Sequence, residues 1–485
     1  MNKKTVIALG AFVALAVIAF VTLRQPEKGE RQSDHPRPIP TINPVEITTL
    51  DVTKGCVTTT ITNEGGTYKV TAPVSFPADQ STVKSAFESL GKLDGTVLVT
   101  QQEAKQAEFE VDDKSGVRLV AKHDGKVLAD LIVGKGVGAG TMVRPSGTTD
   151  VWRASGISKF AFDKGPSDWR DKSITTFQTT DVEKLDVAGK DGAKISLKKT
   201  GTKEGSEDKW DVVSSSVKLE KLDNSVPNGI VSALASWKAN DFADGATLAA
   251  AGLDAPGLTI TVGLKGGKSV TALIGGPKGE KAGEKAGEDT YVKKADAPQI
   301  FLVKKFNLER IAKRPMEFRD KTLCDLGADD LTEISVAAAD KSYTLVKSGT
   351  DWKATKPPKL ELDATKVTPI AGAFKDWKAT GFADDQSLKG SGLAKPKAVI
   401  SAKSKGTKSS AAVCLVRVGD ESADKASYVV ATAKSSDVYL APKWAVDRIL
   451  VKPDDLKKAA SAAAAPATKP AKAAGKPAGM TATKK

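Results

Sequence analysis

The chain has 485 residues, of which 40% are hydrophobic, 27% charged and 5% aromatic. A chain of this length is too long for one ordinary hydrophobic core and suits about three domains of 100 to 200 residues each. The composition is that of a globular protein, which excludes disorder over most of the sequence. Only two histidines are present, His35 and His123, so most histidine-dependent catalysis is excluded as well.

The N-terminus contains an uncharged run of nineteen residues at positions 5–23. As a helix rising about 1.5 Å per residue, this run spans roughly 28 Å, about the thickness of a bilayer's hydrocarbon core. We predict a single transmembrane helix in a bacterial inner membrane, with residues 1–4 in the cytoplasm and the bulk of the chain in the periplasm. A cleaved signal peptide is the competing interpretation, but its apolar region is usually about 7 to 15 residues long and ends in a small-x-small site. The proline-rich residues 24–43 predict a semi-rigid linker.

An internal repeat follows the linker. Tyr68, Trp210 and Trp352 are separated by 142 residues at each step, and each follows an alternating stretch typical of a half-buried strand. After each aromatic come an aspartate (Asp79, Asp223 or Asp363) and a helical pattern. Two further tryptophans, Trp237 and Trp377, lie in nearly identical text, and Gly252 and Gly392 follow them in matching Gly-Leu segments.

The remaining blocks of each repeat are strands and a closing helix, which gives the predicted order β-β-α-β-β-β-β-α. Tight glycine turns between strands favour an α+β fold of mostly antiparallel sheet with helices on one face. We therefore predict three tandem repeat domains at residues 44–177, 178–328 and 329–455. Residues 456–485, rich in alanine, lysine and proline, predict a disordered tail.

The net charge of +14 is unevenly distributed along the chain. The tail holds seven lysines and no acidic residue, so it supplies half of the excess charge and the folded body is only mildly basic. Nucleic acid is therefore not an expected partner. Acidic envelope polymers or lipid headgroups are possible partners of the tail, and an inert solubilising tail is the equally weighted alternative.

The cysteines and the acidic residues give no sign of a metal or cofactor site. Cys56, Cys324 and Cys414 lie far apart, and none belongs to a Cys-x-x-Cys motif or neighbours a histidine. We expect single buried thiols and no cofactor. The paired acids Asp329-Asp330 and Asp384-Asp385 lack the spacing of a calcium loop and are interpreted as turn or helix-start residues.

The repeated text resembles a bacterial family known as domain of unknown function 4340. The elements that carry the resemblance are an N-terminal membrane helix, an aromatic before a proline and aspartate, a Gly-Leu-x-x-Pro segment, a strand ending in glycine and an Arg-Asp-Lys sequence, seen here as Trp210, Asp223, Gly252, Leu253, Pro256, Gly275 and Arg319-Asp320-Lys321. Repeat 1 substitutes Tyr68 and lacks a clear Gly-Leu, and repeat 3 lacks Arg-Asp-Lys. The resemblance implies an accessory role beside ABC-type transport machinery of the gliding-motility kind, and it implies no catalytic residue.

Two pairs of residues could hold an anionic ligand, Arg170-Asp171 and Arg319-Asp320, because a guanidinium suits carboxylates and phosphates. The preferred interpretation is structural, with each aspartate capping or pairing locally and the aromatic before each arginine packed in the core. Trp237 and Trp377 could stack on sugars, but their amphipathic context favours core packing. The glycine-rich residues 134–140 lack the Gly-Lys-Ser/Thr ending of a phosphate loop and predict a hairpin turn.

The sequence contains no recognisable set of catalytic residues. The leading hypothesis is a non-enzymatic, membrane-anchored periplasmic scaffold or accessory subunit that offers its repeated domains to protein partners in the cell envelope. One alternative is an envelope hydrolase that uses carboxylates, which requires a cleft with converging buried acids. Another is a binding protein for an anionic ligand, which requires an apolar pocket lined with arginine at a domain junction.

Overall fold

The computed structural model describes residues 39–201, 208–279, 287–383, 391–405 and 413–458. The predicted transmembrane helix at 5–23, the cytoplasmic residues 1–4, most of the linker and nearly all of the tail lie outside the described residues. Within them, no helix is long and apolar enough to cross a membrane. The chain divides into two compact units, one comprising the residues up to Val217 with Asn224–Glu317, and the other Lys218–Asp223 with the residues from Phe318 onward.

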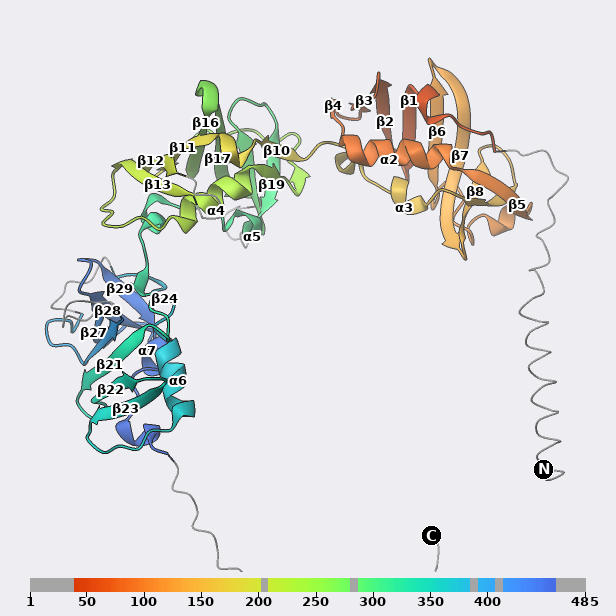
Figure 1. The fold of residues 1–485 in the computed structure, drawn as a ribbon. Helices are drawn as coiled ribbons and strands as arrows, with labels where there is room; N and C mark the ends of the chain where they lie inside the picture. The colour runs from red at the N-terminus through yellow and green to blue at the C-terminus, as the bar shows by residue number, and fades with distance from the viewer. Residues whose placement is uncertain (1–38, 202–207, 280–286, 384–390, 406–412, 459–485) are drawn as a thin grey trace, which may run out of the picture. The chain divides into compact units, whose positions relative to one another are not determined.

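Three antiparallel sheets dominate the described structure, one in each repeat (Figure 1). The first has the strand order β4-β3-β2-β1-β6-β7-β8-β9-β5. Its strands are β1 (Thr49–Lys54), β2 (Val57–Glu64), β3 (Thr67–Ala72), β4 (Phe76–Pro77), β5 (Asp94–Thr100), β6 (Val117–His123), β7 (Lys126–Val137), β8 (Gly140–Pro145) and β9 (Val151–Ser155).

The second sheet repeats this order as β13-β12-β11-β16-β17-β18-β19-β15. Its strands are β11 (Val182–Gly189), β12 (Lys194–Gly201), β13 (Lys209–Ser215), β15 (Asp241–Phe242), β16 (Leu258–Leu264), β17 (Ser269–Pro277), β18 (Asp289–Lys294) and β19 (Ile300–Lys304).

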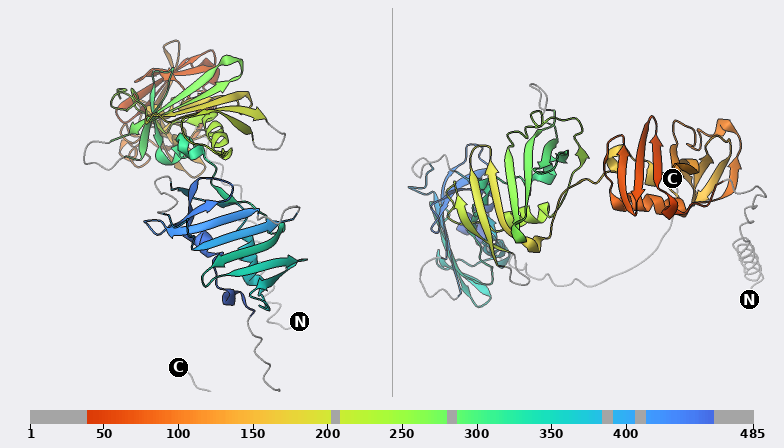
Figure 2. Two further views of the ribbon diagram at one scale, coloured as in Figure 1. Left: turned by 90° about the vertical axis from the view of Figure 1, so that its left-hand side faces the viewer. Right: turned by 90° about the horizontal axis from the view of Figure 1, so that it is seen from above.

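The third sheet has the order β23-β22-β21-β26-β27-β28-β29-β25, and its strands run side by side in the left view of Figure 2. They are β21 (Leu331–Ala338), β22 (Tyr343–Ser348), β23 (Asp351–Lys356), β25 (Gly381–Phe382), β26 (Ala398–Ser404), β27 (Cys414–Glu421), β28 (Ser427–Thr432) and β29 (Val438–Pro442). The same connectivity in all three sheets shows that the sequence repeat is a repeat of structure.

Two short ladders connect consecutive repeats. Strand β10 (Ser173–Thr176), at the end of repeat 1, pairs with β14 (Ser236–Lys238) of repeat 2, and β20 (Thr322–Cys324) pairs with β24 (Trp377–Lys378) in the same way. Repeats 1 and 2 therefore each contribute their last strand to a ladder with the repeat that follows.

Helices are few and short. Each repeat has one longer helix among the described residues: α2 (Gln80–Gly91) after β4, α4 (Ser225–Leu234) after β13, and α6 (Ala364–Gly372) after β23. The side chain of Asp79 accepts a hydrogen bond from the Thr82 N–H and that of Asp363 from the Thr365 N–H, which satisfies main-chain donors at the starts of α2 and α6. Helices α3 (Lys159–Phe162), α5 (Lys305–Leu308) and α7 (Lys443–Asp447) are single turns. The 3₁₀ helices are η1 (Pro44–Glu46), η2 (Glu103–Lys105), η3 (Pro166–Asp168), η4 (Thr179–Asp181), η5 (Lys265–Gly267), η6 (Pro315–Phe318) and η7 (Pro453–Leu456).

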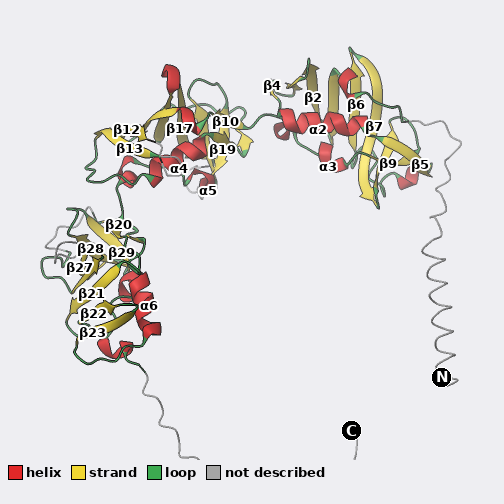
Figure 3. Cartoon of the chain, viewed as in Figure 1, coloured by secondary structure: helices red, strands yellow, loops and turns green. Residues whose placement is uncertain are grey.

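The predicted α+β class with an N-terminal transmembrane helix is wrong for the described residues. Strands predominate there, and the six α-helices include none longer than 12 residues (Figure 3). The amphipathic text around Trp237 and Trp377 forms strands β14 and β24, and the predicted closing helices amount to one turn each. A short apolar run fits both the helical period of 3.6 residues and the strand period of two, and here pairing with a neighbouring strand made these runs strands.

The cores repeat together with the sheets. The side chains of Val83, Ala86, Phe87 and Leu90 on α2 are buried against the first sheet, and α4 and α6 bury matching residues. The main-chain N–H groups of Asp79, Asp223 and Asp363 donate to the carbonyl oxygens of Trp169, Phe318 and Leu456, each over 2.9 Å. Each repeat is thus closed by the same contact between the start of its helix and its last segment.

The glycine in the repeated strand that ends in glycine is required because a neighbouring carbonyl group leaves no room for a side chain. A Cβ at Gly134, Gly275 or Gly419 would lie 2.1 to 2.2 Å from the carbonyl oxygen of Phe109, Ala251 or Ser391 respectively. The residue after each of these carbonyls has a positive φ: 64° at Gly252, 73° at Gly392 and 54° at Glu110. Repeat 1 therefore does contain the turn that its sequence obscured, with a glutamate in place of glycine.

The glycine-rich residues 134–140 belong to the β7–β8 hairpin, where Val137 pairs with Gly140 across the turn. This agrees with the predicted hairpin turn. The prediction of single buried thiols is wrong, because Cys324 on β20 and Cys414 on β27 form a disulfide with a Cα–Cα distance of 5.7 Å, and Cys56 is exposed. Their separation of 90 residues hid the pairing, since the fold alone brings the two strands together.

Candidate functional site

Arg170 is the first sequence-predicted residue with ligand-binding chemistry, and its guanidinium is only 2% exposed. It lies 3.6 Å from the centre of the Phe242 ring. Its two terminal nitrogens donate to the two carboxylate oxygens of Asp244 over 2.6 and 3.1 Å, and one of them also donates to Gln299 over 3.2 Å. These three partners belong to repeat 2, so the charge of Arg170 is used to join repeat 1 to repeat 2.

Arg319 repeats this arrangement at the end of repeat 2. Its guanidinium is 4% exposed, lies 3.6 Å from the centre of the Phe382 ring and pairs with Asp437 over 3.5 Å. Phe382 is the counterpart of Phe242, and Asp437 is the counterpart of Gln299. Both arginines therefore lie at equivalent junctions between repeats, stacked on the same aromatic position.

The aspartates that follow these arginines act locally. The Asp171 carboxylate accepts from the Ser173 N–H and that of Asp320 from the Thr322 N–H, each over 2.9 Å. Asp320 also pairs with Lys221. Although burial raises the pKa of Asp320, the hydrogen bonds from Lys221 and Thr322 outweigh it and hold the pKa below its ordinary value. The residues before the arginines, Trp169 and Phe318, are fully buried.

Trp237 and Trp377 are each 4% exposed and pack in the cores on β14 and β24. Their indole nitrogens are buried without a hydrogen-bond acceptor in the described residues. Neither ring presents a face on which a sugar could stack.

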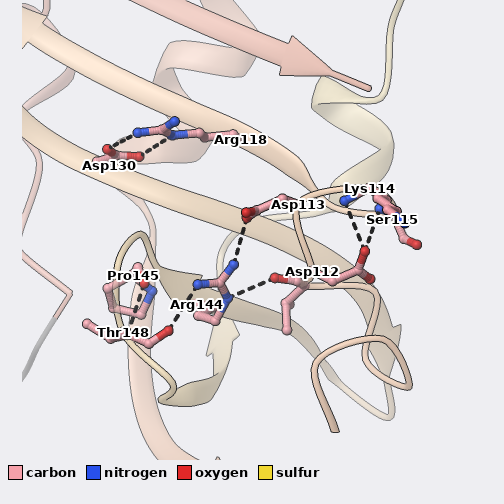
Figure 4. A network of polar contacts seen from close by, with 10 residues as sticks. Asp112, Asp113, Lys114, Ser115, Arg118, Asp130, Arg144, Pro145 and Thr148 are labelled. Atoms are coloured by element: carbon pink, nitrogen blue, oxygen red, sulfur yellow. Dashed lines mark hydrogen bonds and ion pairs between the residues drawn. The ribbon is translucent and has the colours of Figure 1, made fainter. Parts of the chain in front are cut away.

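Repeat 1 contains a further buried arginine that the sequence analysis did not single out. Arg144 is 6% exposed and donates to the Val111 carbonyl over 2.8 Å, the Thr148 carbonyl over 2.9 Å and the Asp113 carboxylate over 2.9 Å. Figure 4 shows it between the loop of Asp113 and that of Thr148. The partners of Arg144 are main-chain and side-chain oxygens that fix the loop before β6, so its role is structural.

The second junction has a polar cluster within its compact unit. The Glu220 carboxylate accepts from the hydroxyls of Ser435 and Ser436 and from the Ser436 N–H. These hydrogen bonds, led by that of the Ser436 hydroxyl, lower the pKa of Glu220 from 4.5 to about 2. A cavity of about 360 Å³ adjoins Glu220, Lys221 and Asp320. Lys221 and Asp320 in its lining pair with each other, as expected of a contact between repeats.

The repeated aromatic position has a different environment in each repeat. In repeat 1, the Tyr68 N–H donates to the side-chain oxygen of Gln80 and the Gln80 amide donates to the Tyr68 carbonyl, both over 2.8 Å. The Tyr68 ring packs on Phe87, with the ring centres 5.0 Å apart. Side chains of α2 thus fill the space beside Tyr68 and satisfy its main chain.

Repeat 2 fills the same space with other residues. The Trp210 N–H donates to the Asn224 side chain over 2.9 Å, and its indole nitrogen donates to Asn228 over 2.7 Å. Lys199, the cross-strand partner of Trp210, pairs with the Asp208 carboxylate over 2.5 Å. Trp210 is only 4% exposed as a result.

Repeat 3 replaces each of these filling groups with a smaller or uncharged residue. Ala364 stands where Gln80 and Asn224 stand in the other repeats, Thr368 replaces Asn228, and Thr350 replaces Asp208. Ala371 takes the place of Phe87 and Val231. The outcome is a cavity of about 310 Å³ lined by Trp352, Lys347, Thr350, Leu362, Ala364, Val367, Thr368, Ala371, Ala328, Asp329 and Asp351.

Lys347 supplies the positive charge of this cavity. Its side chain is 14% exposed and its ammonium lies 5.9 Å from the centre of the Trp352 ring. It donates to the carbonyls of Ala328 over 3.0 Å and Asp329 over 3.4 Å, and the fully exposed Asp329 carboxylate is 3.9 Å away. The cavity therefore combines an aromatic ring, an ammonium group and aliphatic walls.

Sequence reasoning found the aromatic position but missed the cavity beside it. The sequence does carry a signal of the cavity. When the repeats are aligned, Ala364 replaces Asn224 and Thr350 replaces Asp208. The prediction of site residues used only positions that the repeats share, whereas the cavity arises at positions where the repeats differ. Within the part of the chain that the structure describes, no group of three or more histidine, cysteine, aspartate and glutamate residues is arranged to hold a metal ion.

A family profile with the description Domain of unknown function (DUF4340) matches the chain over residues 69–256 and again over 210–396. The chain belongs to the DUF4340 family. The two DUF4340 matches together cover more than half of the chain, and they confirm the family resemblance of the repeats. Each match begins in the third strand of one repeat and ends after the Gly-Leu segment of the next, so each contains one arginine junction. No curated protein and no solved structure is detectably similar to the chain.

Proposed function

We propose that this DUF4340 protein is a non-enzymatic, membrane-anchored scaffold or accessory subunit that works in the periplasm with an ABC-type transport or envelope assembly. The chain is tethered by residues 5–23, and its repeated domains bind protein partners in the envelope. The basic tail at 456–485 adds a contact with acidic polymers or lipid headgroups.

The observation that carries this proposal is the repeated junction. Arg170 and Arg319, the two arginines that the sequence suggested for an anionic ligand, both join one repeat to the next. In this chain the repeated domains are joined to one another by buried charged residues. Such an arrangement is suited to holding protein partners at fixed sites. A binding protein that captures its anionic ligand with these arginines is disfavoured, because protein carboxylates already occupy them.

The disulfide and the uncharged N-terminal run support the proposed compartment. Disulfides persist mainly in oxidising surroundings such as the bacterial periplasm, and the bond between Cys324 and Cys414 suits that location. The uncharged run at 5–23 is long enough to cross a bilayer.

Crosslinking in living cells tests the proposal. The full-length protein, captured by affinity after crosslinking, is expected to bring down a transporter or envelope subunit. Capture that recovers no such subunit would contradict it. A topology reporter fused after residue 453 should be active only outside the cytoplasm, and activity inside would overturn the proposed location.

A further inference from the structure

We propose that repeat 3 binds an extended segment of an acidic protein partner. The main chain of this segment adds to the outer edge of β23, and one of its carboxylates enters the cavity beside Trp352 and pairs with Lys347. The inference rests on the proposed scaffold function and deepens it by naming the chemistry of the partner.

The edge of the sheet supplies the first argument. Strand β23 is last in the order of the third sheet, and its register pairs Ser348 with Asp351 and Lys347 with Trp352. Hydrogen-bonded and non-hydrogen-bonded pairs alternate along an antiparallel ladder, so the main-chain N–H and carbonyl of Trp352 point away from β22, as those of Tyr68 point away from β2. An outward-facing row of such groups is a template for another strand.

The other two repeats show which group fits that edge. The Gln80 side-chain amide accepts from the Tyr68 N–H and donates to the Tyr68 carbonyl, as the peptide group of a neighbouring strand would. Asn224 accepts from the Trp210 N–H in the same way. Ala364 has no polar side chain that could bond to the main chain of Trp352. In repeat 3, a peptide group of a bound partner can therefore make these hydrogen bonds.

The lysine supplies the second argument. In repeat 2, Lys199 is paired with the carboxylate of Asp208 over 2.5 Å, and in repeat 3 the equivalent position is Thr350. A carboxylate in the cavity would give Lys347 the partner that Lys199 has within its own repeat. Because the Lys347 side chain is largely buried, its attraction for a carboxylate in the cavity is screened less than its attraction for one in solvent.

Two acidic residues lie at the cavity, and both face solvent. Asp329 is fully exposed and 3.9 Å from Lys347, and Asp351 is exposed on the edge strand. Water and salt screen such exposed charges strongly, so they oppose an incoming carboxylate less than Lys347 attracts it. The volume of about 310 Å³ is at the small end for ligand cavities and suits one side chain with its adjoining main chain.

Peptide binding to the full-length protein tests this inference. The probe is a heptapeptide of alternating threonine and valine with a central glutamate, acetylated and amidated at its ends so that it carries one charge. Calorimetry should detect binding, and a peptide with glutamine in place of the glutamate should bind about tenfold more weakly because the ion pair with Lys347 is lost. Equal affinity for the two peptides, or binding of neither, would overturn the inference.

Two substitutions at one position separate charge from size. Thr350→Asp supplies Lys347 with an internal carboxylate, as Asp208 does for Lys199, and should weaken binding of the glutamate peptide about tenfold. Thr350→Asn has nearly the same shape without the charge and should leave binding within about twofold of the wild type. Position 350 lies in an exposed hairpin turn, so both variants should fold. Equal effects of the two substitutions would show that Lys347 does not select a carboxylate.

Ala364→Asn tests the main-chain contact. It supplies the acceptor that Asn224 offers to the Trp210 N–H in repeat 2, and it should weaken binding of the glutamate and glutamine peptides alike, because both use the edge of β23. If Ala364→Asn leaves both affinities unchanged, strand addition is wrong. If peptides fail to bind while crosslinking in cells still recovers an envelope partner, the site proposed for repeat 3 falls and the scaffold function stands.

Discussion

Arg170 and Arg319 each bring a charge into a nearly water-free environment at the end of a repeat. Such a charge is tolerated only when hydrogen bonds and a counter-ion replace its hydration. The Asp244 carboxylate and the Phe242 ring do this for Arg170, and the Asp437 carboxylate and the Phe382 ring do it for Arg319. The same residue type therefore solves the same physical problem twice.

Replacing Arg170 should destabilise the contact between repeats 1 and 2. We expect Arg170→Ala to lower the free energy of unfolding of that unit by about 2 kcal/mol, discounted because Asp244 remains 43% exposed. Arg170→Lys should recover only part of the loss, since an ammonium cannot form the two parallel bonds to Asp244. Urea unfolding followed by tryptophan fluorescence measures both, and full rescue by lysine would contradict a role for the guanidinium fork.

Glu220 should make the second junction sensitive to acid. Its pKa is lowered from 4.5 to about 2 by hydrogen bonds that exist only in the folded protein. A carboxyl group with a lowered folded pKa contributes stability that is present above its unfolded value of about 4.5 and is lost as the pH falls toward 2. The urea midpoint of this unit should therefore fall across that window in the wild type and fall less steeply in Glu220→Gln. Identical pH profiles would show that the carboxylate is not held by Ser435 and Ser436 in solution.

At the scale of elements, some glycines are explained by another stretch of backbone that lies too close to leave room for a side chain. Gly275 on β17 must be a glycine because a Cβ there would lie 2.2 Å from the Ala251 carbonyl oxygen. At the adjacent Gly276, the corresponding distance to the same oxygen is 3.9 Å. We expect Gly275→Ala to lower the free energy of unfolding by about 2 kcal/mol or more through overpacking, and Gly276→Ala to change it little. Chemical unfolding of the two variants measures this difference, and equal effects would contradict the packing seen at Gly275.

The disulfide acts on two elements of repeat 3, since it joins β20 to β27 across 90 residues. Closing so long a loop restricts the unfolded chain, and its loss should cost about 2 to 4 kcal/mol. Cys324→Ala with Cys414→Ala should show this loss in the unfolding transition of that unit, and Cys56→Ser serves as the control because Cys56 is exposed and free. A double variant as stable as the wild type would mean that the bond does not form.

The sequence predicted some elements better than others, for physical reasons. The helices after Asp79 and Asp363 could be predicted because a capping side chain and an apolar face coincide there. The strands at Trp237 and Trp377 could not be, because their identity depends on pairing with β10 and β20, which arrive from the previous repeat. The cavity beside Trp352 depends on the smaller or uncharged residues Ala364 and Thr350, which stand out in the sequence only when the three repeats are aligned and their differences are compared.

At the scale of the whole molecule, three copies of one sheet topology differ in how they satisfy the aromatic residue on their third strand. Repeats 1 and 2 satisfy the aromatic on their third strand with their own side chains, and repeat 3 does not. Divergence of this kind is how a duplicated domain can acquire a binding surface while its copies remain structural. The proposed scaffold thus has two repeats whose own side chains satisfy this aromatic and a third whose sheet edge is open to a partner.

A photocrosslinking amino acid placed on the edge strand of repeat 3 tests this account most directly. It is placed in living cells at Lys353, exposed on β23, and for comparison at Asp211, the exposed residue after Trp210 on β13. The account predicts that Lys353 crosslinks a specific acidic protein of the envelope, and that the crosslink weakens when Thr350→Asp is added. Equal crosslinking from the two positions, or none from Lys353, would contradict it.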